Sequence, residues 1–181
     1  MAKTKNNGRW LVITPELMRA ILDQYPLSLH GTHGISHWAR VLENGQRLAS
    51  ITGANLMVVE LFAVFHDSQR RNEHLDPGHG RRGAELAASL RSSYYELGDE
   101  DFALLYTACE HHTDGLINAD ITVQTCWDSD RLDLGRVWIS PSPERMCTRA
   151  AKTEEIIEWA NQRSTKNTLP DWVATEWGIR L

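Results

Sequence analysis

The sequence predicts an all-α protein, and the spacing of its apolar residues carries that prediction. Apolar residues recur at helical spacing along most of the chain, which is the pattern of amphipathic helices. No segment alternates apolar and polar residues over several positions, as a half-exposed strand would. With 181 residues, of which 41% are hydrophobic, the chain can bury one core and is too short to favour two. We therefore expect a single domain over residues 1–181.

Turn residues and helix caps divide the chain into a series of expected helices. The first begins after Thr14, an N-cap residue followed by Pro15 at the first helical position, and ends before Pro26. The others are expected over residues 31–53, 55–65, 80–95, 100–111, 122–132 and 144–161. The helix at 55–65 is apolar on most sides, so it should lie in the centre of the core. The segment at 122–132 begins with β-branched residues, so a strand is the alternative there.

Both ends of the chain are expected to lie outside the core, which spans about residues 14–161. Residues 1–9 are polar and basic with no long apolar stretch behind them, which indicates a flexible tail rather than a secretory signal. Residues 162–181 form a C-terminal tail whose Trp172 and Trp177 favour core or interface packing over base stacking.

The composition argues against several classes of protein. A net charge of -5 disfavours binding to a nucleic acid polymer, although a local group of arginines could still bind a small phosphorylated substrate. The longest strongly apolar run, residues 57–65, is too short to span a bilayer, so no membrane partner is expected. Cys109, Cys126 and Cys147 match no zinc or redox spacing and fit a reducing compartment. We expect a cytoplasmic protein, and its oligomeric state cannot be read from the sequence.

Histidine and aspartate residues gather at the ends of the expected helices. His66 and Asp67 are adjacent, directly after the most apolar helix, and His37 lies on the helix before it. Two polar groups at the edge of a core are costly unless something compensates them, and a metal ion does so. Imidazole and carboxylate together suit Zn, Mn, Fe, Co or Ni, and to a lesser degree Mg. A further carboxylate is supplied by Asp130 or, as the alternative, by Asp128.

The order of these residues resembles the H…HD…D signature of the HD superfamily. The resemblance covers roughly residues 30–135 and implies a helical bundle around one metal ion or two. It also implies phosphohydrolase activity on nucleotides or other phosphate esters. The metal ligands that it implies are His37, His66, Asp67 and Asp130. Asp130 is preferred to Asp128 because it directly precedes Arg-Leu, as in the family's usual pattern.

Further histidines raise the possibility of a second ion. Some HD enzymes use additional histidines for it, with the aspartate of the doublet as the bridge, and His79, His111 and His112 are available here. His79 also begins a helix, where a substrate phosphate would be favoured. The Gly-Tyr-Pro element of the cyclic-dinucleotide branch does not follow His112, so that activity is in doubt.

Arginine side chains are the expected partners of a substrate phosphate, because guanidinium forms bidentate hydrogen bonds with its oxygens. We assign catalytic roles to Asp67, Arg70, His79 and His111, and substrate-binding roles to Arg40, Arg71, Arg81, Arg82 and His112. Glu73 and Glu110 are candidate proton-transfer groups, and His33 is a candidate for lining the site.

The function expected from these residues is hydrolysis of a phosphate ester or anhydride of a small molecule, such as a nucleotide, by metal-activated water. Two alternatives stay open. The first is a di-iron oxygenase, a small branch of the same fold that needs ligands in the order H, HD, H, H, D. The second is a non-catalytic, nucleotide-binding HD domain. The sequence leaves open the substrate, the metal, and the choice between one ion and two.

Overall fold

The structure is a computed structural model that describes residues 5, 6, 9, 10 and 12–181. Its helices are α1 (Pro15–Leu22), α2 (Ile35–Thr52), α3 (Leu56–Phe65), α4 (His79–Leu90), α5 (Asp99–His111), α6 (Ile121–Arg131) and α7 (Glu154–Thr165). Short turns of helix are η1 (Leu134–Val137), η2 (Pro143–Arg145) and η3 (Val173–Trp177). The strands β1 (Lys5–Asn6) and β2 (Arg9–Trp10) pair in antiparallel fashion. The fold is therefore all-α, as the sequence predicted.

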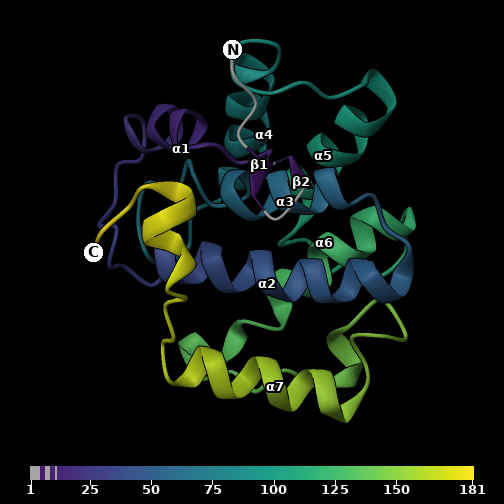
Figure 1. The fold of residues 1–181 in the computed structure, drawn as a ribbon. Helices are drawn as coiled ribbons and strands as arrows, with labels where there is room; N and C mark the ends of the chain where they lie inside the picture. The colour runs from purple at the N-terminus through teal and green to yellow at the C-terminus, as the bar shows by residue number, and fades with distance from the viewer. Residues whose placement is uncertain (1–4, 7–8, 11) are drawn as a thin grey trace.

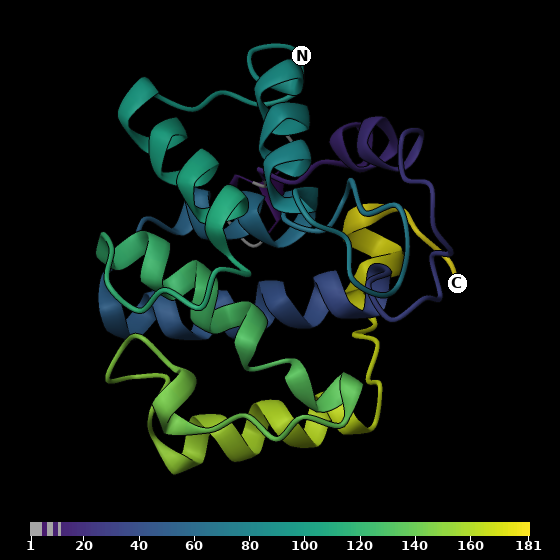
Figure 2. The ribbon, with the colours of Figure 1, turned by 180° about the vertical axis from the view of Figure 1, so that it is seen from behind.

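Helix α3 lies at the centre of the molecule, as its apolar sequence indicated. Every residue from Val58 to Phe65 is buried, and the helix packs against α2, α5 and α6. Asn55 caps its start, because the side chain accepts hydrogen bonds from two backbone N–H groups of the first turn. In Figure 1, α2 runs across the middle of the molecule, with α7 below it and α4 and α5 above it. Seen from behind, α6 crosses in front of α2 (Figure 2).

The last long helix starts later than the sequence predicted. We expected a helix over 144–161, but α7 begins only after Thr153. The cause is the buried carboxylate of Asp128, which accepts hydrogen bonds from the backbone N–H groups of Cys147 (2.7 Å) and Thr148 (2.8 Å). Those bonds hold the segment against α6 in a non-helical conformation. Burial raises the pKa of Asp128, although these hydrogen bonds oppose the rise.

The other differences lie at the ends of elements. Helix α4, expected to reach residue 95, ends at Leu90, because Arg91 is extended and Ser92 has a positive φ of 66°. The strand pair β1–β2 falls within the segment expected to be a flexible tail, and residues 1–4, 7 and 8 of that segment lie outside the described residues. In the C-terminal tail, Trp177 is buried and belongs to the main core, as the sequence favoured.

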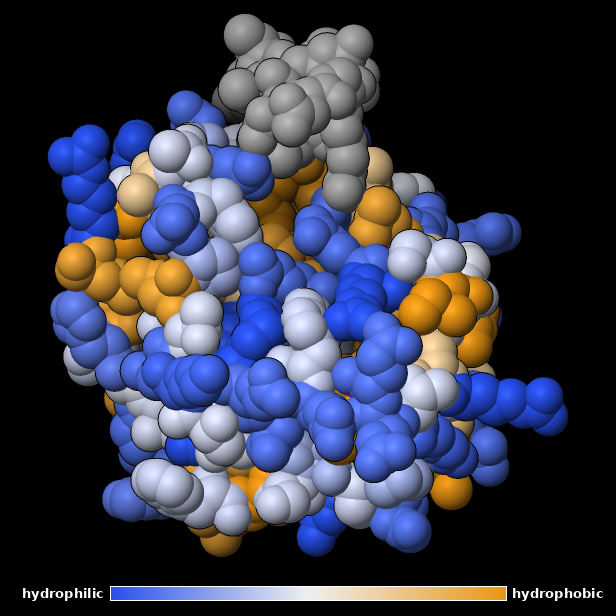
Figure 3. Space-filling view, turned by 60° about the horizontal axis from the view of Figure 1, so that its bottom comes forward, coloured by the Kyte–Doolittle hydropathy of each residue, from blue (hydrophilic) through white to orange (hydrophobic). Residues whose placement is uncertain are grey.

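The surface is mostly hydrophilic on the face that Figure 3 shows, where apolar patches are separate from one another. Within the described part of the chain, no helix combines the length and the apolar character needed to cross a membrane.

Candidate metal centre

Helix ends from most of the bundle converge on one buried place. The first turn of α2, the end of α3, the start of α4, the end of α5 and the last turn of α6 each contribute polar side chains. The converging side chains are His37, His66, Asp67, His79, His112 and Asp130. Most of them are almost fully buried, and the Asp130 side chain is 15% exposed. The structure thus brings together the four expected metal ligands, and it adds His79, which was expected to be catalytic, and His112, which was expected to bind substrate.

Four of these side chains surround one point. The Nε2 atoms of His37 and His66 lie 3.1 Å apart. Asp67 Oδ2 lies 3.5 Å from the first of these atoms and 3.6 Å from the second. Asp130 Oδ1 lies 3.5 Å and 3.9 Å from the same two atoms. Two nitrogens and two carboxylate oxygens therefore face a shared centre, which we call the first group.

The other oxygen of Asp67 belongs to a second group. Asp67 Oδ1 lies 3.1 Å from His79 Nε2 and 3.5 Å from His112 Nε2. The two Nε2 atoms lie 3.0 Å apart. Asp67 thus offers one oxygen to each group and stands as the bridge between them.

Hydrogen bonds fix the tautomer of all four histidines. In each ring Nδ1 faces an oxygen that can only accept, so Nδ1 carries a proton, and in the neutral ring Nε2 keeps its lone pair. The acceptors are Asp133 Oδ2 for His37 (2.7 Å), Phe62 O for His66 (3.1 Å), Asp76 O for His79 (2.7 Å) and Cys109 O for His112 (2.7 Å). The four lone pairs point into the cluster.

This donor set fits a divalent cation. Two nitrogen lone pairs face each other at 3.0 to 3.1 Å only when a proton or a cation lies between them. In addition, Asp130 Oδ1 is buried and accepts no hydrogen bond from any described residue. A buried carboxylate oxygen without a partner is costly, and a metal ion would satisfy it. The His and Asp side chains could therefore hold a divalent metal.

The charge states of the ligands agree with this. Burial lowers the pKa of His66 to about 3, so the ring is neutral and able to bind metal. Burial alone would raise the pKa of Asp130, but the Arg136 guanidinium and the imidazoles of His66 and His37 lower it to about 2. Burial likewise opposes ionisation of Asp67, yet the surrounding histidines hold its pKa well below the usual range. Both carboxyl groups are therefore anionic at neutral pH.

Asp133 supports the cluster from behind, and the sequence analysis did not single it out. It is fully buried, and its carboxylate accepts a hydrogen bond from His37 Nδ1. Arg40 donates two hydrogen bonds to the same carboxylate, one from Nε (2.6 Å) and one from Nη2 (3.0 Å). The guanidinium of Arg40, expected to bind substrate, is thus committed to a carboxylate of the protein. The signal was present in the sequence, since Asp133 follows Asp130 by one helical turn.

Replacing Asp133 with asparagine should lower metal affinity about 10- to 100-fold, because the carboxylate fixes the ring and tautomer of His37. Titration of metal-stripped protein with Mn²⁺ by calorimetry measures the change. Asp128→Asn is the matched control, since it removes another buried carboxylate of the same region that contacts none of the six cluster residues. Equal loss of affinity in both variants, or none in Asp133→Asn, would contradict the role.

Arg70 reaches the second group, as its expected catalytic role requires. Its Nη1 donates to His79 Nε2 at 2.9 Å and lies 3.4 Å from Asp67 Oδ1. The guanidinium therefore brings positive charge to the lone pairs of the second group. The first group has no such contact from Arg70 among the described residues.

His111 does not join the cluster, although it was expected to be catalytic. Its side chain is 39% exposed, and Nδ1 pairs with Asp114 at 2.7 Å on the outside of the molecule. Its neighbour His112 turns inward instead. Adjacent residues at a helix end point roughly 100° apart, so only one of the two can reach the cluster.

Three arginines expected to bind substrate also lie away from it. Arg81 pairs with Glu85 on the exposed face of α4. Arg82 forms two hydrogen bonds with the carboxylate of Asp76 and so braces the loop before α4. Arg71 is exposed and donates its backbone N–H to the same carboxylate. The structure therefore does not bring these three side chains to the cluster, because neither spacing from Asp67 nor a place at the start of a helix determines the direction in which a side chain points.

Arg136 is a residue of the site that the sequence analysis missed. It follows α6 in η1, and its Nη2 lies 3.8 Å from Asp130 Oδ1. Two backbone carbonyl groups position its guanidinium, since Nε donates to Thr32 O and Nη1 to Asp133 O, both at 3.2 Å. Its distance from the doublet in sequence left no local signal.

The fold is similar to that of a known structure. No protein-family model matches the chain, and no curated protein matches it. Among solved structures, it is similar to the crystal structure of a predicted HD superfamily hydrolase from an uncultured Thermotogales bacterium. The two are 25% identical, the match covers 83% of this chain and 86% of that chain, and the TM-score is 0.63. The chain therefore has the fold of the HD superfamily, as the order of its histidine and aspartate residues indicated.

Proposed function

We propose that this chain is a metal-dependent phosphohydrolase that cleaves a phosphate ester or anhydride of a small molecule, with nucleotides as the expected substrate class. The observation that carries the proposal is Asp67, which presents its two oxygens to two separate groups of histidine lone pairs. A divalent ion held there would lower the pKa of bound water from about 15.7 toward about 7 and polarise a phosphoryl oxygen. The hydrolase description of the structural neighbour agrees with this chemistry at a coarse level.

We infer two ions of unequal affinity. The first group offers two imidazoles and two carboxylates, and the nearby Arg136 guanidinium, 3.8 Å from Asp130 Oδ1, forms no hydrogen bond with that oxygen. In the second group, Arg70 already donates to His79 Nε2 and must withdraw before an ion can bind. An ion should therefore enter the first group more tightly than the second.

Two side chains near the cluster would bind the substrate phosphate and exclude water. Arg136 keeps an open donor at Nη2, which makes no hydrogen bond within the described residues, and it faces the metal ligand Asp130. A guanidinium in that position would neutralise a phosphate oxygen and orient it. Phe62 stacks on His66 at 4.8 Å and closes the apolar side of the cluster to water.

A di-iron oxygenase is the second candidate, and one observation favours it. The six clustered residues occur in the order H, HD, H, H, D, which is the ligand set that such enzymes need. Iron content and oxygen consumption distinguish the two functions, because an oxygenase should bind two irons and be inert in anaerobic hydrolysis assays.

Phosphate release from a panel of nucleotides and other phosphate esters tests the proposal. Metal-stripped protein is assayed alone and after addition of Mn²⁺, Mg²⁺, Co²⁺, Ni²⁺ or Fe²⁺. Release that needs the metal supports a hydrolase and begins to identify the substrate. Tight nucleotide binding without product under every metal would favour the non-catalytic HD domain, and oxygen-dependent turnover would favour the oxygenase.

A further inference from the structure

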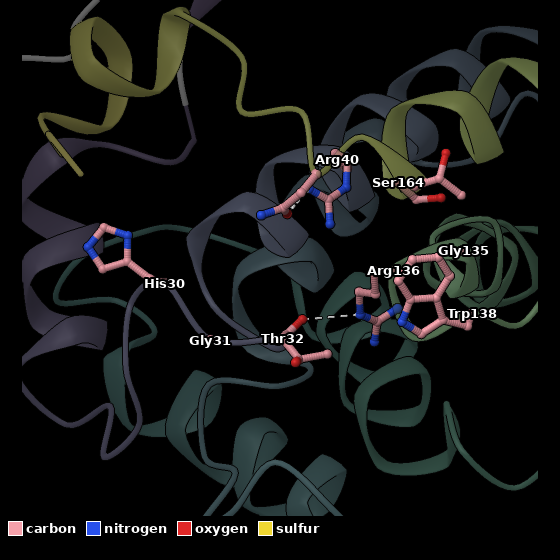
Figure 4. A pocket seen from close by; sticks show the side chains of 10 residues that line it. His30, Gly31, Thr32, Arg40, Gly135, Arg136, Trp138 and Ser164 are labelled. Carbon is pink, nitrogen blue, oxygen red and sulfur yellow. Dashed lines mark hydrogen bonds between the residues drawn. The ribbon is translucent and has the colours of Figure 1, made fainter.

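A cavity of about 240 Å³ has Arg40 and Arg136 in its lining (Figure 4). It is bounded by the segment before α2, by η1 and by the C-terminal end of α7. Polar residues such as Thr32, Ser164 and Asn167 line it. The roles assigned so far make no use of this space.

Arg136 connects the cavity with the metal centre. It lines the cavity, and its Nη2 lies 3.8 Å from Asp130 Oδ1. A phosphate that contacts Nη2 would therefore lie beside Asp130. The organic part of the same molecule would then have the cavity next to it.

Trp138 stands at the edge of the same cavity in a conformation that packing does not explain. Its side chain is 91% exposed, and its backbone is left-handed with φ 63° and ψ 21°. For a residue with a side chain of this size, that conformation is unfavourable. Trp138 and Arg136 both line the cavity, and Figure 4 labels both side chains. An unburied aromatic ring on a strained backbone indicates a binding surface.

We propose that this cavity binds the leaving group of the substrate, and that this group is a single nucleoside. The inference rests on the proposed function. Trp138 stacks on the base, Arg136 contacts the phosphate, and the polar residues of the lining meet the edge of the base and the ribose. Asn167 can donate in this way, because its Oδ1 accepts from Arg40 and no described residue accepts from its amide nitrogen.

The size and lining of the cavity support one nucleoside rather than other leaving groups. Its volume lies below the roughly 300–1,000 Å³ of pockets for drug-sized ligands, which favours one nucleoside over a dinucleotide. A purely apolar aryl group would leave the amide nitrogen of Asn167 without an acceptor among the described residues. A base has both a flat face for Trp138 and a polar edge.

The kinetic test compares adenosine 5′-monophosphate with ribose 5-phosphate in wild type, Trp138→Ala and Trp138→Phe. Wild type should favour the nucleotide. Trp138→Ala should raise KM for the nucleotide about 5- to 100-fold through loss of stacking, with a smaller effect on kcat, and Trp138→Phe should restore most of it. Tyr94→Ala is the matched control, because it removes another exposed aromatic ring and should leave both substrates unchanged.

A binding test separates this inference from the proposed function. Calorimetry measures adenosine binding to the metal-free protein, which needs neither phosphate nor turnover. Binding that is lost in Trp138→Ala and kept in Tyr94→Ala supports the nucleoside site even if no substrate is hydrolysed. Hydrolysis of ribose 5-phosphate as fast as the nucleotide, with no adenosine binding, would overturn the site and leave the hydrolase standing. A Trp138→Ala protein that binds adenosine normally but changes its sedimentation would show instead that the ring is an interface between two copies.

Discussion

Asp67→Asn is expected to reduce phosphate release by more than about 10³-fold, which corresponds to about 4 kcal/mol of transition-state stabilisation. The reason is that one carboxylate serves both groups, with Oδ2 near His37 and His66 and Oδ1 near His79 and His112. Asparagine keeps the volume but removes the charge and one of the two acceptor oxygens. The bound metal should therefore fall from two ions to one at most, as measured by elemental analysis of the purified variant.

Asp114→Asn is the control for this experiment. Asp114 pairs with the exposed His111, and none of its contacts reaches the cluster. Activity and metal content should stay at the wild-type level there. An Asp67→Asn protein that is folded, retains two ions and turns over at the wild-type rate would show that Asp67 is not the bridge.

The helices and the central residues of the site could be predicted because the local sequence pattern determines them. A helix that is apolar on most sides, such as α3, packs in the centre of a small domain. The doublet of His66 and Asp67 at its end therefore lies at the core as well. His37 and Asp130 could be placed from the family order. For these residues, the chain itself fixes the direction in which the side chain leaves its helix.

The rest of the site depends on contacts between segments far apart in the chain. The choice of His112 over His111 is set by the angle at which α5 meets α4, where His112 meets His79. The family order already favoured Asp130 over Asp128, and in the structure Asp128 instead accepts a hydrogen bond from Cys147 of the following loop. Arg136 reaches Asp130 only because η1 turns back toward the cluster. No spacing rule contains these angles, so pattern alone could not choose His112 over His111 or find Arg136.

Removal of metal should lower the melting temperature. A ligand that binds only the folded state, at a free concentration of 100 times Kd, stabilises it by about 2.7 kcal/mol. For a chain of this length that corresponds to a rise in Tm of about 5–11 °C. Thermal unfolding of stripped protein with and without Mn²⁺ measures the shift. In Asp130→Asn the shift should be much smaller, because the first group loses an anionic ligand.

The rise in melting temperature that Mn²⁺ causes should also become larger as pH rises from about 6 to 8, and the protonation of His112 determines this direction. Burial alone would lower the pKa of His112, but its hydrogen bond to Asp67 and the negative charges nearby raise it overall. Protonated His112 therefore stabilises the metal-free fold below the ordinary pKa, and that contribution is lost as pH rises through the raised value. A metal ion binds only the neutral ring of His112. The metal-bound form therefore becomes more stable relative to the metal-free form as pH rises over the same interval. The pKa of Asp130, lowered to about 2, lies far below this window and does not contribute to the change. A shift that stays constant from pH 6 to 8 would mean that no proton leaves the cluster when the ion binds, and the assignment of His112 Nε2 as a ligand would have to be withdrawn.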